Sequence, residues 1–157
     1  SSPDIVLSLH ACDLATDEAL AQAVHWETDL VLAAPCCQQE LSGQIRSNIH
    51  QPVLKHGILK QRTADILTDA VRSNLMQIAG YRSEVIEFIS SEETSKNLMI
   101  RAERGLRLEK SGSKNLAKVV DEYRELKAFW GIEPSLEKYL GDRVSRHIIT
   151  ESACALL

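Results

Sequence analysis

Two short apolar segments of this 157-residue chain end abruptly in residues that can do chemistry. The segments are Asp4–Leu9 and Asp29–Ala34, and the polar residues that follow them are His10, Cys12, Asp13, Cys36, Cys37 and Gln38. A histidine or a carboxylate can accept a proton from a nucleophile, and an amide side chain can recognise a base or another amide. The two segment ends are therefore the candidate chemical centre of the chain.

The residues between these segments predict how the two ends are positioned. Residues 15–24 place alanine, leucine and valine side chains on one face of a helix, with Thr16 as its expected N-cap. The pattern is strand, helix, strand, and such a crossover makes the two strands parallel. Because open α/β sheets bind ligands beyond the carboxyl ends of their strands, both polar ends should face the same ligand.

His10 and Asp13 are the candidate catalytic residues. A histidine can accept a proton near neutral pH, and Asp13 can orient it or bind a hydroxyl or an amine of a substrate. The structural alternative is that His10 only ends the strand and Asp13 only caps the following helix. Asp17, in the first helical turn, is a candidate substrate-binding residue or else a partner of the helix dipole.

Five segments of the chain carry recognisable motifs: His10–Asp17, Ala34–Leu41, Asp65–Arg72, Gly80–Tyr81 and Thr94–Arg101. The first two resemble the fourth- and fifth-strand motifs of a group of class I, Rossmann-like, S-adenosylmethionine-dependent methyltransferases, and the others resemble later segments of that group. The pattern Cys12–Asp17 and the paired cysteines are also distantly similar to the tRNA ribose methyltransferases. The resemblance covers about residues 3–104.

The resemblance implies an α/β fold, the second half of a Rossmann-like methyltransferase sheet with flanking helices. It implies a single partial domain over residues 1–157, with the sheet-forming catalytic half at 1–109 and a helical extension at 110–157. The implied cofactor is S-adenosylmethionine and the implied acceptor is RNA. The alternative is a non-catalytic methyltransferase-like module that binds RNA or protein.

The glycine-rich loop with which that family holds its cofactor has no counterpart in the sequence. The seven glycines are scattered, and no Gly-x-Gly cluster follows an expected strand. We therefore expect the chain to be the carboxyl-terminal half of a longer enzyme. On its own it should be inactive and should bind S-adenosylmethionine very weakly, and no cofactor-binding residue is assigned.

Three cysteines are candidate substrate-binding residues: Cys12, Cys36 and Cys37. Their positions in the sequence allow three interpretations of their role. Packing of small side chains at tight strand ends is favoured. In the second, Cys36 or Cys37 attacks a pyrimidine ring, as in RNA cytosine-5 methyltransferases, whose catalytic cysteine also follows the fifth strand. In the third, the three cysteines and His10 bind zinc, although adjacent cysteines on a strand end chelate poorly. We expect no bound metal.

Gln38, Arg62 and Asn97 complete the candidate substrate-binding set. Gln38 can both donate and accept hydrogen bonds, as recognition of a base or an amide requires. Arg62 and Asn97 lie in or close to the family-like segments and are expected to face the acceptor. The alternatives are a solvent-facing residue opening a helix for Gln38 and a surface charge for Arg62.

The composition and charge of the chain limit where the protein can be located and which partners it can bind. No apolar run is long enough to cross a bilayer and no signal-peptide pattern is present, so we expect a cytoplasmic protein with reduced thiols and no membrane partner. The net charge is −4, yet residues 1–45 carry seven acids and no lysine or arginine, whereas residues 101–118 carry six basic residues against two acidic ones. The second stretch is a candidate RNA-contacting surface or a solvated helix face.

The remaining elements follow from periodicity and turn residues. We expect a long helix from Leu59 to Ile78 with Gly80 after it, two strands over Arg82–Ser90 and Asn97–Glu103, a helix over 113–130 and a short helix over 134–140. The resemblance implies that the two strands form an antiparallel hairpin at the end of the sheet. The strand Asp4–Leu9 would lack one neighbour in the resembled sheet. We expect its free edge to be covered by self-association or by the tail Arg143–Leu157.

Overall fold

The computed structural model describes residues 2–88, 97–105 and 112–149, and the side chains of 112–114 are left aside. Its centre is a four-stranded sheet of β1 (Ile5–Leu9), β2 (Leu30–Ala34), β3 (Tyr81–Glu87) and β4 (Leu98–Arg104), in the spatial order β1-β2-β4-β3. β1 and β2 pair in parallel, and β4 is antiparallel to both of its neighbours. The fold is mixed α/β and Rossmann-like, and the expected terminal hairpin is confirmed.

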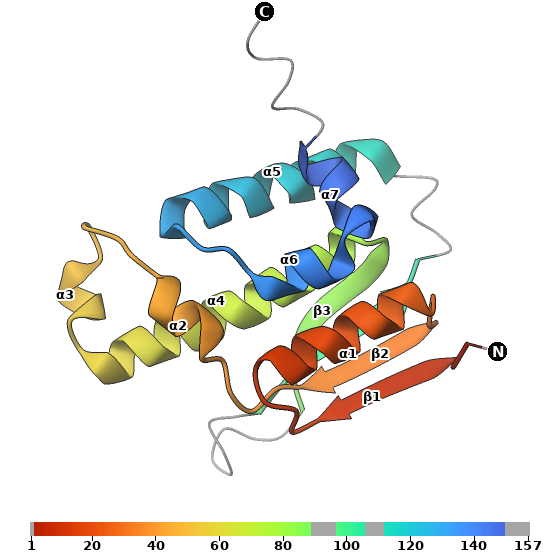
Figure 1. The fold of residues 1–157 in the computed structure, drawn as a ribbon, viewed down its shortest axis with the longest axis horizontal. Coiled ribbons are helices and arrows are strands. Elements are labelled where there is room, and N and C mark those ends of the chain that lie inside the picture. Colours follow the sequence, from red (N-terminus) through yellow and green to blue (C-terminus); the bar gives the residue numbers. More distant parts are fainter. Residues whose placement is uncertain (1, 89–96, 106–111, 150–157) are drawn as a thin grey trace, which may run out of the picture.

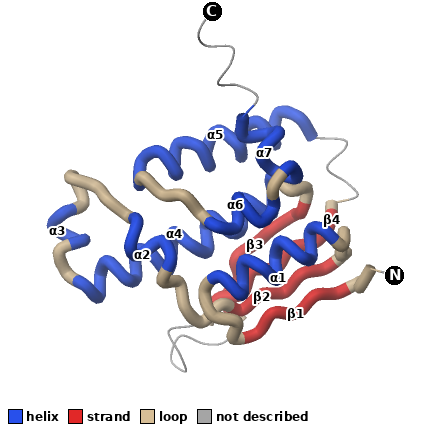
Figure 2. Tube along the Cα trace, viewed as in Figure 1, coloured by secondary structure: helices blue, strands red, loops and turns tan. Residues whose placement is uncertain are grey.

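Seven helices complete the described part of the chain (Figures 1 and 2). They are α1 (Leu14–His25), α2 (Glu40–Gln44), α3 (Gln51–Leu54), α4 (Gly57–Ile78), α5 (Gly112–Trp130), α6 (Ser135–Leu140) and α7 (Asp142–Ile149). α4 ends as expected, because Gly80 adopts a φ of 97°, a left-handed conformation that glycine reaches without steric cost. No helix in the described segments has the length and apolar character needed to span a membrane.

The expected N-cap of the first helix is wrong. Asp13, not Thr16, occupies the N-cap position of α1, and its side chain makes no capping hydrogen bond there. Thr16 lies inside the helix, where its hydroxyl donates to the carbonyl oxygen of Ala11 at 2.8 Å. The helix therefore begins closer to the end of β1, which holds the polar residues after β1 in a tight turn.

One hydrophobic core lies between the sheet and the helices. The inward face of the sheet contributes Val31, Ala33, Ile100 and Ala102, all at most 1% exposed. α1 and α4 pack on this face, and the same core continues into α5, α6 and α7 through Val120, Tyr123, Leu136, Leu140 and Val144. The helices after β4 are thus joined to the core of the sheet.

The opposite face of β1 is open among the described residues. Ile5, Leu7 and Leu9 are 55%, 62% and 57% exposed, and β1 pairs only with β2. The expectation that the tail covers this edge is wrong for residues 143–149, because α7 packs against α4, α5 and α6 instead. Residues 150–157 lie outside the described residues.

We expect the chain to self-associate through β1. An unpaired strand edge beside an apolar face templates pairing with a second copy, and a lysine on that face opposes such pairing. Light scattering after gel filtration should find a concentration-dependent dimer or larger species, which Leu7→Lys shifts to monomer. Ile66→Lys, at a residue that is 67% exposed on α4, is the matched control and should leave association unchanged. A wild-type chain that stays monomeric at every concentration contradicts this prediction.

Candidate functional site

The two polar strand ends lie side by side at the carboxyl edge of the parallel pair. The strand pairing extends past β1 and β2: the backbone N–H of His10 donates to Ala34 at 3.1 Å, and that of Asp13 donates to Cys37 at 3.2 Å. Cys12 and Cys37 form an isolated parallel bridge. The backbone therefore fixes the residues after β1 against those after β2, and the sequence predicts this juxtaposition correctly.

The backbone after β1 is strained at both candidate catalytic residues. His10 has a φ of 55° and Asp13 a φ of 47°, and neither is a glycine. Such conformations cost of order 1–3 kcal/mol each and concentrate at functional sites. His10 is exposed to solvent. The turn that carries both residues is thus held in place by the surrounding structure against its local preference.

One of the two carboxylate oxygens of Asp13 accepts a hydrogen bond, and the other has no partner among the described residues. Its Oδ2 accepts a hydrogen bond from the backbone N–H of Glu40 at 3.0 Å, so the side chain caps α2 and not the helix that follows it in sequence. Its Oδ1 is buried and has no hydrogen-bond partner among the described residues. Buried carboxylate oxygens in native structures are nearly always bonded, so a bound water or a ligand is the expected partner of this oxygen.

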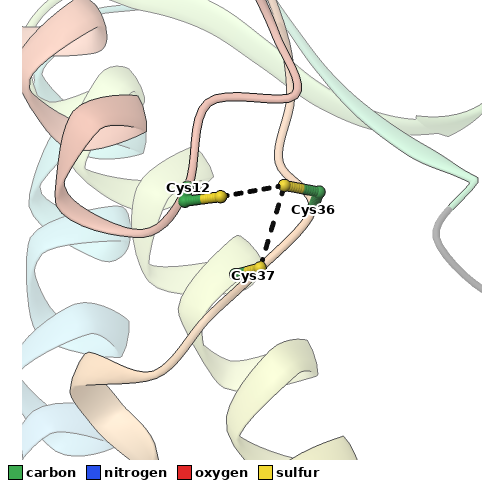
Figure 3. Close-up of side chains that lie close together, drawn as sticks. All are labelled: Cys12, Cys36 and Cys37. Atoms are coloured by element: carbon green, nitrogen blue, oxygen red, sulfur yellow. Dashed lines mark hydrogen bonds between the residues drawn. The ribbon is translucent and has the colours of Figure 1, made fainter.

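Three cysteine side chains converge at the same edge (Figure 3). The Sγ atoms of Cys12 and Cys36 are 3.4 Å apart and those of Cys36 and Cys37 are 3.8 Å apart. Cys12 is exposed and the other two are half-buried, and all three are free thiols. The packing interpretation is therefore wrong for Cys12. Interactions with Cys36 and Cys37 raise the pKa of Cys12 to about 11, so its reactive thiolate form is scarce at neutral pH.

A buried ion-pair network lies beneath the edge and is centred on Arg72 of α4. The Arg72 guanidinium is 1% exposed and donates to Asp17 Oδ1 at 2.6 Å and to Asp69 Oδ1 at 3.4 Å. It also donates to the carbonyl oxygen of Asp13 at 2.8 Å. Arg72 thereby ties the strained turn to α1 and α4, and Asp17 is a buried partner of Arg72 with 2% of its surface exposed.

Gln38 belongs to the same network. Its amide donates to the two carboxylate oxygens of Asp69 at 3.2 and 3.0 Å, and the residue is 2% exposed. Gln61 on α4 donates to the backbone oxygen of Gln38 at 3.1 Å. The alternative of a solvent-facing residue is wrong for Gln38, which anchors the segment after β2 to α4.

Arg62 and Asn97 are carried by elements other than β1 and β2. Arg62 is exposed on α4. Asn97 precedes β4 at the same edge of the sheet as the end of β2, but its side chain is 7% exposed and donates to Glu87 at 2.6 Å. This hydrogen bond joins the residue before β4 to the last residue of β3.

The comparisons with known proteins match the segment that carries this edge. Residues 1–44 match a family model described as a methyltransferase domain. The matched segment contains β1, α1, β2 and α2, and therefore the strained turn and all three cysteines of the cluster. No curated protein and no solved structure matches the chain significantly.

Sequence reasoning missed Arg72 and Asp69, although a signal for Arg72 was present. α4 buries Val71, Leu75 and Met76, and Arg72 falls on the same face of the helix. A charged residue on an apolar helical face is rarely buried unless it is paired. The position of Arg72 therefore indicated a buried partner, while the identity of that partner, 55 residues earlier in the sequence, depends on the fold.

The ionisation of Asp17 makes stability depend on pH. Burial raises the pKa of Asp17 from 3.8 to about 6, against the lowering effect of Arg72. The folded chain therefore binds the proton more tightly than the unfolded chain between these values, and the stabilising contribution of Asp17 decreases as the pH rises through this window. We expect the difference in unfolding free energy between wild type and Asp17→Asn to fall by up to about 3 kcal/mol from pH 4 to pH 7.

Urea unfolding at each pH measures this difference, because asparagine does not titrate. A difference that increases with pH would mean that Arg72 holds the Asp17 carboxylate ionised despite its burial.

Proposed function

We propose that this chain is the acceptor-side part of an S-adenosylmethionine-dependent methyltransferase whose acceptor is RNA. The observation that carries the proposal is the turn after β1. There the strained backbone presents a carboxylate oxygen of Asp13 that is buried and has no partner among the described residues. The match of residues 1–44 to a methyltransferase domain supports methyl transfer as the reaction at this edge.

S-adenosylmethionine supplies an electrophilic methyl group on a sulfonium. The chain's own residues would bind the acceptor hydroxyl or amine, align it with that methyl group and receive its proton. Asp13 would bind the acceptor hydroxyl or amine through Oδ1 and would take up its proton when the acceptor is methylated. Positioning of this kind supplies much of the rate enhancement in group transfer.

The geometry at Asp13 fits that task. The bond from Glu40 fixes Oδ2 and the bond from Arg72 to the backbone oxygen of Asp13 fixes the turn, so Oδ1 has a defined direction. His10 on the same turn is exposed and can contact the acceptor. We assign no cofactor contact to a particular residue of the chain.

RNA as the acceptor is supported by the motif resemblance and not by free positive charge. The described basic residues on the outer face of β3 and β4 are each paired with acids: Arg82 with Glu84, and Arg101 with Glu103. Arg104 pairs with Glu27 and Asp29. The structure therefore favours a solvated surface at Arg101 and Arg104. A reducing, cytoplasmic location is part of the same proposal and rests on the sequence pattern.

Calorimetry with S-adenosylmethionine tests this proposal against a non-catalytic module. The natural gene product that contains these residues should bind the cofactor, and the 157-residue chain alone should bind it very weakly. Absence of binding to the natural gene product would favour a methyltransferase-like module that binds RNA or protein without catalysis.

A further inference from the structure

The thiols of Cys12, Cys36 and Cys37 form a three-point cluster that the proposed methyl transfer does not use. All three sulfurs lie within 4.8 Å of one another, although Cys12 is 24 residues away from Cys36 in sequence. We propose that this cluster is a binding site for a thiophilic d¹⁰ cation, Zn²⁺ or Cu⁺, with three thiolate ligands from the chain. This proposal does not depend on the methyltransferase activity.

The spacing of the sulfurs fits a shared metal ion. Zinc–sulfur bonds of about 2.3 Å place the sulfurs of a tetrahedral site about 3.8 Å apart. The observed separations are 3.4 Å for Cys12 and Cys36 and 3.8 Å for Cys36 and Cys37. Only small side-chain adjustments are needed to place one ion between the three sulfurs.

The backbone holds the ligands in this arrangement before any ion binds. Cys12 and Cys37 occupy a parallel bridge, and the Asp13 N–H donates to the Cys37 carbonyl oxygen at 3.2 Å. Adjacent cysteines such as Cys36 and Cys37 chelate poorly by themselves. Here Cys12, which follows β1, supplies a third sulfur. The exposure of Cys12 leaves a route for the ion and room for a solvent ligand.

The segment of the chain that carries the thiols is acidic in sequence. The segment that supplies all three cysteines, residues 1–45, contains seven acids and no lysine or arginine. Ionised thiols would therefore find no compensating cation on their own segment. A thiol must lose its proton to bind a metal as a thiolate, so binding of the ion should release protons. Soft thiolate ligands select Cu⁺ and Zn²⁺ over hard cations.

The test is a spectroscopic titration of the reduced 157-residue chain with Co²⁺, which absorbs visibly when it is held by thiolates. Cys154, which lies outside the described residues, is replaced by serine in every sample, so that any bound metal is held by the three clustered thiols. We expect thiolate-to-cobalt charge transfer that saturates at about one ion per chain, with release of protons. Displacement of Co²⁺ by Zn²⁺ or by Cu⁺ under anaerobic conditions identifies the preferred ion.

Cys12→Ser supplies the decisive comparison, because it removes one sulfur from an exposed position. We expect affinity for Co²⁺ to fall by more than the roughly 10–100-fold that loss of an outer-shell partner costs. A second measurement needs no variant in the cluster. Zn²⁺ should protect Cys12, Cys36 and Cys37 from alkylation, and peptide mass spectrometry measures that protection. Absence of charge transfer with excess Co²⁺, or equal alkylation of the three cysteines with and without Zn²⁺, would overturn the proposal.

Discussion

Replacement of Arg72 with methionine should lower the free energy of unfolding by about 3–5 kcal/mol. Arg72 is 1% exposed and bonds to Asp17, Asp69 and the backbone oxygen of Asp13. Methionine fills much of the same space but leaves two carboxylates buried without their cation. Because domains are stable by only about 5–15 kcal/mol, the loss would be a large fraction of the total. Urea unfolding followed by circular dichroism measures it.

The matched control lies on the same helix. Arg62→Met changes an exposed arginine of α4 and should alter the unfolding free energy by no more than about 0.5 kcal/mol. Asp17→Asn combined with Arg72→Met should recover part of the loss, because the double variant buries one unpaired charge fewer. If Arg72→Met were as mild as Arg62→Met, the ion-pair network would not hold the edge together.

The second large effect is expected at Asp13. In the natural gene product, Asp13→Ala should reduce methyl-transfer turnover by about 10²-fold or more, the scale of a lost general base or orienting group. The physical reason is the loss of Oδ1, the buried oxygen that has no partner among the described residues. Turnover under saturating cofactor measures the effect, and His10→Ala should lower activity as well.

Two further variants separate chemistry from folding at this position. Asp13→Gly also removes the carboxylate, but glycine tolerates the φ of 47°, so it should lose activity without the backbone strain. Asp4→Ala changes an exposed aspartate just before the opposite end of β1 and should keep near-normal turnover. Near-normal turnover in both Asp13 variants would remove Asp13 from the reaction.

Local patterns predicted the strand ends well because they depend on near neighbours in sequence. The apolar runs before His10 and Pro35 and the helix between them determine a parallel pair, so the meeting of the two polar ends could be predicted. The left-handed Gly80 after α4 was predictable for the same reason, whereas the pairing of β3 and β4 in a hairpin was implied by the family resemblance.

The contacts that organise the site depend on long-range folding and were not predictable in detail. Asp17 was expected to face a substrate or the helix dipole, but it pairs with Arg72, 55 residues later. Gln38 was expected to be available for recognition, but Asp69 binds its amide. The convergence of the cysteines depends on strand pairing that continues past β2, which spacing along the sequence does not reveal.

Transfer of a labelled methyl group from S-adenosylmethionine by the natural gene product tests the central claim most directly. The protein is incubated with labelled cofactor and total cellular RNA, and the RNA and protein fractions are then counted. We expect label in RNA, and much less label with Asp13→Ala than with Asp4→Ala. Label in the protein fraction alone would exclude RNA as the acceptor. Absence of label from every fraction, with the cofactor bound, would contradict the claim that this edge catalyses methyl transfer.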